Sequence, residues 1–126
     1  MRAIDTNVLV RLIARDDPKQ TAAAEAFIAD GAWVSQLVLT ETAWVLDAVY
    51  SRSAAQIATA IEMLLGHATL TIQDPEVIAH ALRQFRQHPG LGFSDCLVLE
   101  IARKAGHLPL GTFDRQLRRL QGAQRL

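Results

Sequence analysis

Only one cysteine, Cys96, is present among the 126 residues of this chain, so an internal disulfide is excluded. Aromatic residues make up 6% of the sequence, and thirteen basic residues balance thirteen acidic ones. No apolar run reaches the roughly 18 residues that a membrane-spanning helix needs. No basic segment followed by an apolar one indicates a secretion signal. These absences exclude a disulfide-rich secreted domain and a membrane protein. They predict one cytoplasmic domain over residues 1–126.

Several common signatures of enzymes and cofactor-binding proteins are also missing. The sequence contains no Gly-rich phosphate loop, and its four His residues are too scattered for a zinc site. No Ser–His–Asp set is evident. Cys96 has acidic and apolar neighbours, which do not favour a thiolate, so we interpret it as a packed side chain.

Short apolar stretches alternate with segments of helical spacing along the whole chain. Strands are expected at residues 2–5, 32–35, 69–72 and 108–110, and helices at 7–14, 18–30, 37–50, 53–66, 75–88, 94–105 and 114–120. This alternation predicts an α/β fold with three α/β/α layers and a short, mainly parallel sheet. The terminal "GAQRL" is a poor strand sequence, so a final edge strand after Leu120 is left open.

Two acidic residues follow expected strands. Asp5 follows the apolar start of "RAIDTNVLV", and Asp114 ends "LPLGTFD". Ligands of parallel α/β sheets bind beyond the carboxyl ends of the strands, so both are candidate site residues. The alternative is that each only caps a helix. Thr112 is either a turn hydroxyl or a hydrogen-bond donor to a neighbouring carboxylate, and we favour the second.

Two further acidic residues lie on expected helices. Glu41 shares one helical face with Leu37, Trp44, Val45 and Ala48, which predicts that it projects from the core side. A buried carboxylate is normally paired, protonated or bound to a metal, so a salt bridge is the alternative to a ligand role.

Asp95 lies in the first turn of its expected helix and shares one helical face with Val98, Leu99 and Ala102. Its alternative role is to stabilise the helix dipole, with Ser94 as the cap. Glu100 lies on another face of the same helix and is left out of the site.

Carboxylates that converge repel one another and need a cation. Ligands that are all oxygen indicate Mg²⁺ or Mn²⁺, and such a site suits phosphodiester hydrolysis. From Arg103 to Leu126 the chain has six basic residues and one acidic residue, Asp114. This basic segment is either a solvated surface or a contact for a polyanion.

The segments "DTNVLV", "LVLTETAWVL", "FSDCLVLEIARKAG" and "LGTFDRQLRRL" occur in an order that resembles PIN-domain proteins, and more narrowly VapC-type toxin ribonucleases of bacterial toxin–antitoxin pairs. The resemblance covers nearly the whole chain. It implies that Asp5, Glu41, Asp95 and Asp114 are the catalytic metal ligands, with Asn7 and Thr112 in support. It also implies Mg²⁺ or Mn²⁺ dependence, an RNA substrate, a cognate antitoxin partner and a homodimer.

The expected contacts with the two macromolecular partners are less defined. RNA phosphates would bind Arg11, Arg15 or Arg115 at the rim of the site. The antitoxin would occupy an apolar groove near the second and third helices, with candidate lining residues Ala24, Phe27, Ile28, Trp44 and Leu46.

Other protein classes fit less well. A haloacid-dehalogenase-type phosphatase needs a second acid where Asn7 stands, and a phosphoryl-transfer receiver needs a Lys after a late strand, whereas the only Lys residues are Lys19 and Lys104. A catalytically inactive nucleic-acid-binding or scaffold protein of the PIN fold remains the alternative, although all four acids are present.

Overall fold

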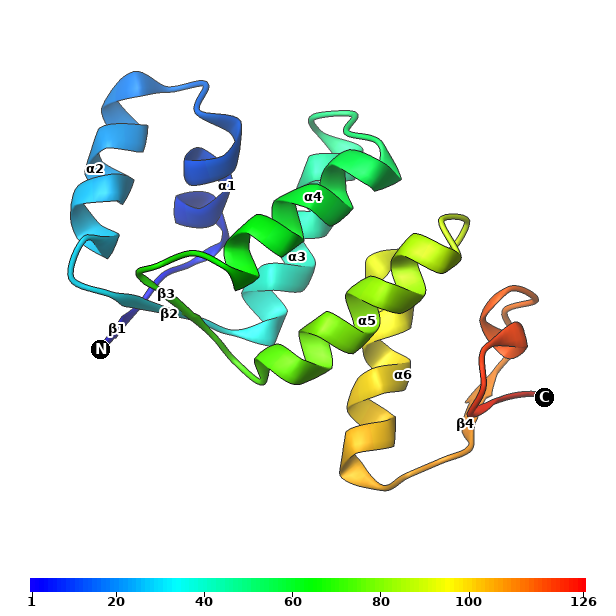
Figure 1. Cartoon of the computed structure of the whole chain (residues 1–126). Helices are drawn as coiled ribbons and strands as arrows, with labels where there is room; N and C mark the ends of the chain where they lie inside the picture. The colour runs from blue at the N-terminus through cyan, green and yellow to red at the C-terminus, as the bar shows by residue number, and fades with distance from the viewer. The chain divides into compact units, whose positions relative to one another are not determined.

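The computed structural model describes residues 1–126 and divides into two compact units, Met1–Pro75 and Glu76–Leu126. The first unit contains a three-stranded parallel sheet in the order β1-β2-β3. Its strands are β1 (Arg2–Ala3), β2 (Ala32–Val34) and β3 (Leu70–Ile72). A pair of helices connects each strand to the next, as parallel strands require a long crossover (Figure 1). These helices are α1 (Thr6–Ala14), α2 (Pro18–Ile28), α3 (Gln36–Ala48) and α4 (Ala54–Leu65).

Each helix of the first unit begins at a side-chain cap. Oxygen atoms of the capping residues accept hydrogen bonds from backbone N–H groups of the first turn, which otherwise lack partners; the caps are Asp5, Asp17, Ser35 and Ser53. Apolar side chains from the helices and from β2 form the core, among them Leu9, Val34, Leu39, Leu46 and Ile61. The caps therefore fix where each helix starts, and the core fixes which face turns inward.

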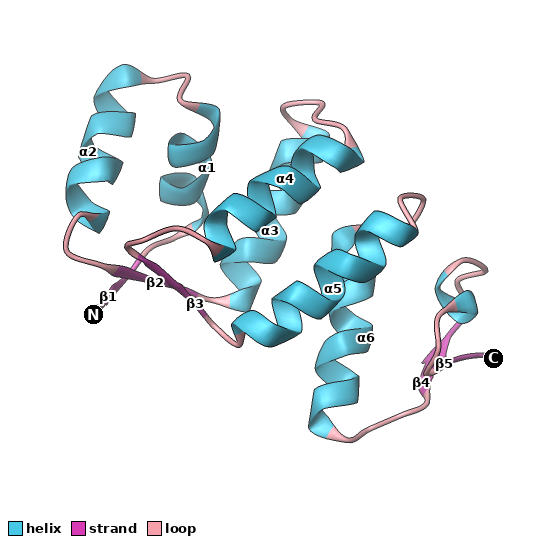
Figure 2. Cartoon of the chain, viewed as in Figure 1, coloured by secondary structure: helices cyan, strands magenta, loops and turns pink.

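The second unit combines two long helices with a short C-terminal segment (Figure 2). Its elements are α5 (Pro75–Gln87), α6 (Phe93–Ala105), β4 (Leu110–Thr112), the 3₁₀ turn η1 (Leu117–Arg119) and β5 (Ala123–Arg125). The two helices pack through Phe85 and Phe93, whose ring centroids lie 5.9 Å apart at 77°. Strands β4 and β5 pair in parallel.

The predicted α/β class with a short parallel sheet is confirmed, and most predicted boundaries are within two residues of the observed ones. The bounds predicted for the strand at 108–110 are wrong: β4 begins only at Leu110, because Pro109 has no N–H to contribute to the hydrogen bonds between strands. The helix predicted at 114–120 is reduced to η1. The final strand left open by the sequence does form, as β5. None of the helices is long and apolar enough to span a membrane.

Candidate active site

Asp5 lies between β1 and α1 and caps the helix. Its Oδ1 accepts a hydrogen bond from the N–H of Val8 at 3.2 Å. The capping role considered for Asp5 is therefore real. This bond uses only Oδ1, however, and Asp5 is exposed to solvent. The second carboxylate oxygen remains available to a ligand, so capping and ligation are compatible.

Glu41, on α3, lies close to Asp5. Its Oε2 accepts a hydrogen bond from Thr6 Oγ1 at 2.8 Å, and Thr6 directly follows Asp5 in the chain. This bond joins Glu41 to the first residue of α1, the helix that Asp5 caps. Thr6 was not among the predicted site residues, because no local sequence pattern links its hydroxyl to a carboxylate 35 positions away.

The predicted orientation of Glu41 toward the core is wrong. Glu41 is exposed, as are Leu37 at 67% and Trp44 at 66% on the same face of α3. The buried face of the helix consists of Leu39, Thr42, Ala43 and Leu46. Helix α3 is apolar on both faces, so hydrophobic spacing alone could not identify the buried one. The salt bridge considered for Glu41 is also absent.

Asp95 lies in the first turn of α6 and is half-buried. The expected cap, Ser94, is wrong: the helix starts one residue earlier, with Gly92 at the capping position and no side-chain hydrogen bond there. The apolar stripe predicted around Asp95 is only partly buried, because Leu99 is fully buried whereas Val98 is 51% exposed. The first-turn position places the Asp95 carboxylate where the helix dipole favours a negative charge.

Asp114 follows β4 and closes a turn. Its Oδ1 accepts hydrogen bonds from the N–H groups of Gln116 at 2.7 Å and Leu117 at 2.9 Å. The bonds from Leu117 and then Gln116 lower the pKa of Asp114, which keeps it ionised at neutral pH. The favoured role of Thr112, as a donor to a neighbouring carboxylate, is wrong. Its Oγ1 accepts a hydrogen bond from the Asp114 N–H at 3.0 Å, so Thr112 acts as a turn hydroxyl.

The four predicted ligands share one electrostatic property: none of them forms an ion pair within its own unit. Several other acids do, namely Asp16, Glu25, Glu76 and Glu100. Carboxylate oxygens are ligands that Mg²⁺ and Mn²⁺ prefer, and a carboxylate outside an ion pair is available for that role. Each unit carries two of the four acids, and neither unit gathers three His, Cys, Asp or Glu side chains able to hold a metal. A four-ligand site therefore stays a prediction.

The candidate phosphate-binding residues differ in how they are held. Arg11 donates to Asp16, Gln20 and Tyr50, and the bonds to Tyr50 and then Asp16 raise its pKa. Arg15 pairs with Glu25 at 2.5 Å. Arg115 is exposed, as is Asn7 in the first turn of α1. Binding of RNA by these residues stays a prediction, and Arg115 is the arginine among them that has no acidic partner.

Glu100 is the main residue that the sequence analysis set aside. Its side chain is 4% exposed, and its Oε1 lies 3.2 Å from Arg103 Nε. Arg103 Nη2 also donates to the Gln121 carbonyl at 2.6 Å, so this pair connects α6 to the C-terminal segment. A lone acid within the apolar run "LVLEIA" was the available signal.

Cys96, also on α6, is buried, as predicted, and burial raises the pKa of its thiol to about 11.

An apolar cavity of about 810 Å³ lies in the first unit. Helices α1, α2 and α4 form its walls, and the apolar lining includes Leu12, Ile13, Ile28, Ala60, Met63 and Leu64. The groove predicted near the second and third helices is not this cavity. Of the residues predicted to line it, Ile28 alone contributes, while Ala24 and Leu46 are core residues and Trp44 projects from another face.

Replacing Asp5 by Asn separates ligation from capping. Because Asp5 lies near Glu41, neutralising it removes a repulsion between carboxylates in the metal-free protein. We expect Asp5→Asn to raise the melting temperature in chelator by about 2–4 °C, or roughly 1 kcal/mol. It should also gain less stability from Mn²⁺, since a ligand stabilises the folded state according to its affinity. Thermal melts with chelator and with Mn²⁺ measure both effects.

Asp17→Asn is the matched control, because Asp17 caps α2 through the same kind of bond, to the Gln20 N–H at 3.0 Å. Asn caps a helix about as well as Asp, so this variant should melt like the wild type in both conditions. If Asp5→Asn behaves like Asp17→Asn throughout, Asp5 is a cap and nothing more.

A family model described as PIN domain matches residues 3–123. No curated protein matches the chain, and no solved structure does.

Proposed function

Because this chain belongs to the PIN-domain family, we propose that it is a divalent-metal-dependent endoribonuclease and the toxin of a bacterial type II toxin–antitoxin system. The family assignment supports a nuclease in general. The toxin role, the RNA substrate and the metal come from the resemblance of the four motifs to VapC-type toxins. From that resemblance alone, we also propose a cytoplasmic homodimer.

One observation supports the nuclease role most directly. Asp5, Glu41 and Asp114 each accept hydrogen bonds at one carboxylate oxygen and keep the other free: Asp5 and Asp114 accept from nearby backbone N–H groups, and Glu41 accepts from the Thr6 hydroxyl. Asp95 adds a carboxylate in a helical first turn. Side chains that are fixed in place yet have a free oxygen and no cationic partner suit the binding of Mg²⁺ or Mn²⁺.

The proposed roles follow from that chemistry. Asp5, Glu41, Asp95 and Asp114 would hold the cation, which when bound supplies activation of the attacking water and stabilisation of the leaving oxygen. Thr6 orients Glu41 through its hydroxyl, and Thr112 fixes the turn that carries Asp114. Arg115 would contact a flanking phosphate, as an arginine outside any ion pair.

A cleavage assay with the purified chain tests the proposal. Single-stranded RNA should be cut in Mg²⁺ or Mn²⁺ and left intact in chelator, and the new RNA ends should map to defined internal sites. Binding of RNA without cleavage in either metal would favour the alternative, an inactive nucleic-acid-binding or scaffold protein of the same fold.

We place the proposed antitoxin partner in the cavity between α1, α2 and α4. A groove with apolar walls between helices is the shape that receives the apolar face of an amphipathic helix. Arg15 and Glu25 in the lining pair with each other, so Arg52 is the lining arginine that has no acidic partner. Its positive charge favours an acidic helical segment as the occupant.

We therefore expect Met63→Glu to abolish co-purification with the product of the adjacent small reading frame. Met63 is 68% exposed and lines the cavity, so a charge there disrupts an apolar contact with little effect on the core. Trp44→Glu is the matched control: Trp44 is 66% exposed on α3, in the groove expected from the sequence. Loss of the partner only with Trp44→Glu would restore the original location and contradict this one.

A further inference from the structure

The ring of Phe113 is unusually open to solvent for its position. Its exposure is 80%, and it stands between Thr112 and Asp114, at the end of β4. A single exposed apolar side chain needs no explanation by itself. The surroundings of Phe113 are what give it a meaning.

The backbone on both sides of Phe113 is fixed. The Asp114 N–H donates to Thr112 Oγ1 at 3.0 Å, and the Leu126 N–H donates to the Thr112 carbonyl at 2.9 Å. Asp114 in turn caps the backbone that follows it. The ring is therefore presented to solvent from a rigid turn, directly beside a predicted metal ligand.

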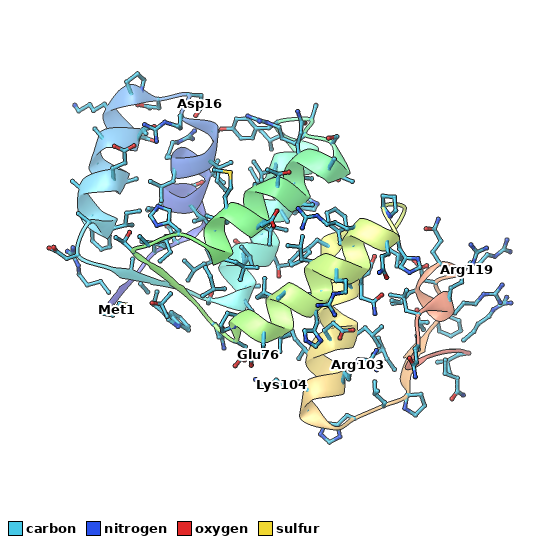
Figure 3. All side chains as sticks on the ribbon, viewed as in Figure 1. Met1, Asp16, Glu76, Arg103, Lys104 and Arg119 are labelled. Atoms are coloured by element: carbon cyan, nitrogen blue, oxygen red, sulfur yellow. The ribbon has the colours of Figure 1, made fainter.

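Arginines without acidic partners lie in the segments that contact this turn. Arg125 is the cross-strand partner of Thr112 in the pairing of β4 with β5. The Arg118 N–H donates to the Asp114 carbonyl at 3.2 Å, and Arg118 Nε donates to the Arg115 carbonyl at 3.2 Å. Arg119 projects from the same segment (Figure 3). Asp114 is the only acid between residues 110 and 126, so no carboxylate within the segment competes with these arginines except the predicted ligand.

An exposed aromatic ring among unpaired arginines is the chemistry that binds single-stranded nucleic acid: the ring stacks on a base and the guanidinium groups contact the backbone phosphates. A base in a duplex is already stacked and cannot cover the ring. Phe113 and Arg115 lie in the turn after β4, Arg118 lies on η1 and Arg125 lies on β5, which pairs with β4, so one nucleotide and its phosphates could reach them together.

We propose that Phe113 is a base-stacking platform and that Arg115, Arg118 and Arg125 contact the adjacent phosphates, so that the segment after β4 binds an unpaired nucleotide of single-stranded RNA beside Asp114. The inference rests on the proposed function and refines its substrate to RNA that is unpaired at this nucleotide. It makes Phe113 a substrate-positioning residue.

The test measures binding of a labelled oligouridine to the full chain by fluorescence anisotropy, in chelator so that no cleavage occurs. Stacking on one base is worth roughly 1–3 kcal/mol, so Phe113→Ala should weaken binding by about 5- to 100-fold. Phe113→Trp should restore it. Trp44→Ala, which removes an exposed aromatic residue from the first unit, should leave binding unchanged.

Two probes separate stacking from a general loss of structure. A blunt RNA duplex should bind wild type and Phe113→Ala equally, because duplex binding uses the arginines alone. An oligonucleotide with abasic positions should also bind the two proteins equally. Equal binding of oligouridine by wild type and Phe113→Ala, or an equal loss for the duplex, would overturn the inference.

Failure of this inference is distinguishable from failure of the proposed function. A chain that binds single-stranded RNA through Phe113 but cuts none in Mn²⁺ keeps the subsite and loses the nuclease role. If Phe113→Ala cuts RNA in Mn²⁺ with unchanged KM and kcat, the nuclease role stands and the subsite is overturned. A rise in KM with little change in kcat is the result expected for a positioning residue.

Discussion

Asp95→Asn is expected to lower the rate of RNA cleavage in Mn²⁺ by roughly 10³-fold or more, the scale of losing a group that stabilises transition-state charge. The substitution keeps the shape of the side chain in the first turn of α6 and removes its negative charge. Helix stability should change little, since the interaction of a first-turn charge with the helix dipole is worth about 0.3–1 kcal/mol. Single-turnover cleavage rates, with circular dichroism to verify the fold, measure the effect.

Glu76→Gln is the matched control for Asp95→Asn. Glu76 also lies in the first turn of a helix of the second unit, and its charge pairs with Lys104 at the surface, which lowers its pKa. Removing this charge should leave cleavage near the wild-type rate. Cleavage that persists in chelator and survives Asp95→Asn would contradict the assignment of Asp95 as a catalytic ligand.

The largest expected effect on stability comes from Arg103→Met. This change leaves the Glu100 carboxylate, whose side chain is 4% exposed, without its guanidinium partner. It also removes the bond from Arg103 to the Gln121 carbonyl. Breaking a buried pair from one side costs about 3–5 kcal/mol, and we expect about 3 kcal/mol here because Arg103 is partly exposed. Urea denaturation monitored by circular dichroism measures it.

The double variant Glu100→Met/Arg103→Met shows whether the buried charge is the cause. Replacing both members of a buried pair by apolar groups is often neutral or stabilising. The double variant should therefore be more stable than Arg103→Met alone, although both lack the bond to Gln121. A double variant as unstable as the single one would mean that the link to the C-terminal segment dominates, and not the loss of the guanidinium beside the Glu100 carboxylate.

The order of helices and strands was predictable from the sequence because its signals are local. Caps such as Ser35 and Ser53 and the break at Gly106, which adopts a φ of +82°, act within one or two turns of the chain. Pro109 also acts locally, but its effect was predicted wrongly: β4 begins after Pro109 and does not include it.

The side-chain environment of the candidate site was less predictable. Glu41 was expected on the core face because α3 offers two apolar faces, and only packing against α1 and α4 decides which is buried. Glu100 was set aside on its helical position, although a partner three residues along the same helix allows a charge to be buried there. Hydrogen bonds such as Thr6 to Glu41 join residues distant in sequence, so no local pattern reveals them.

The backbone hydrogen bonds of Asp5 and Asp114, two proposed metal ligands, have an evolutionary consequence. Each residue holds its backbone turn through one oxygen, and an Asn oxygen can accept the same bonds. A single Asp→Asn replacement at either position would therefore remove a charge while sparing the fold. Descendants of such a chain could lose catalysis in one step and persist as folded binding proteins, open to selection for a different task.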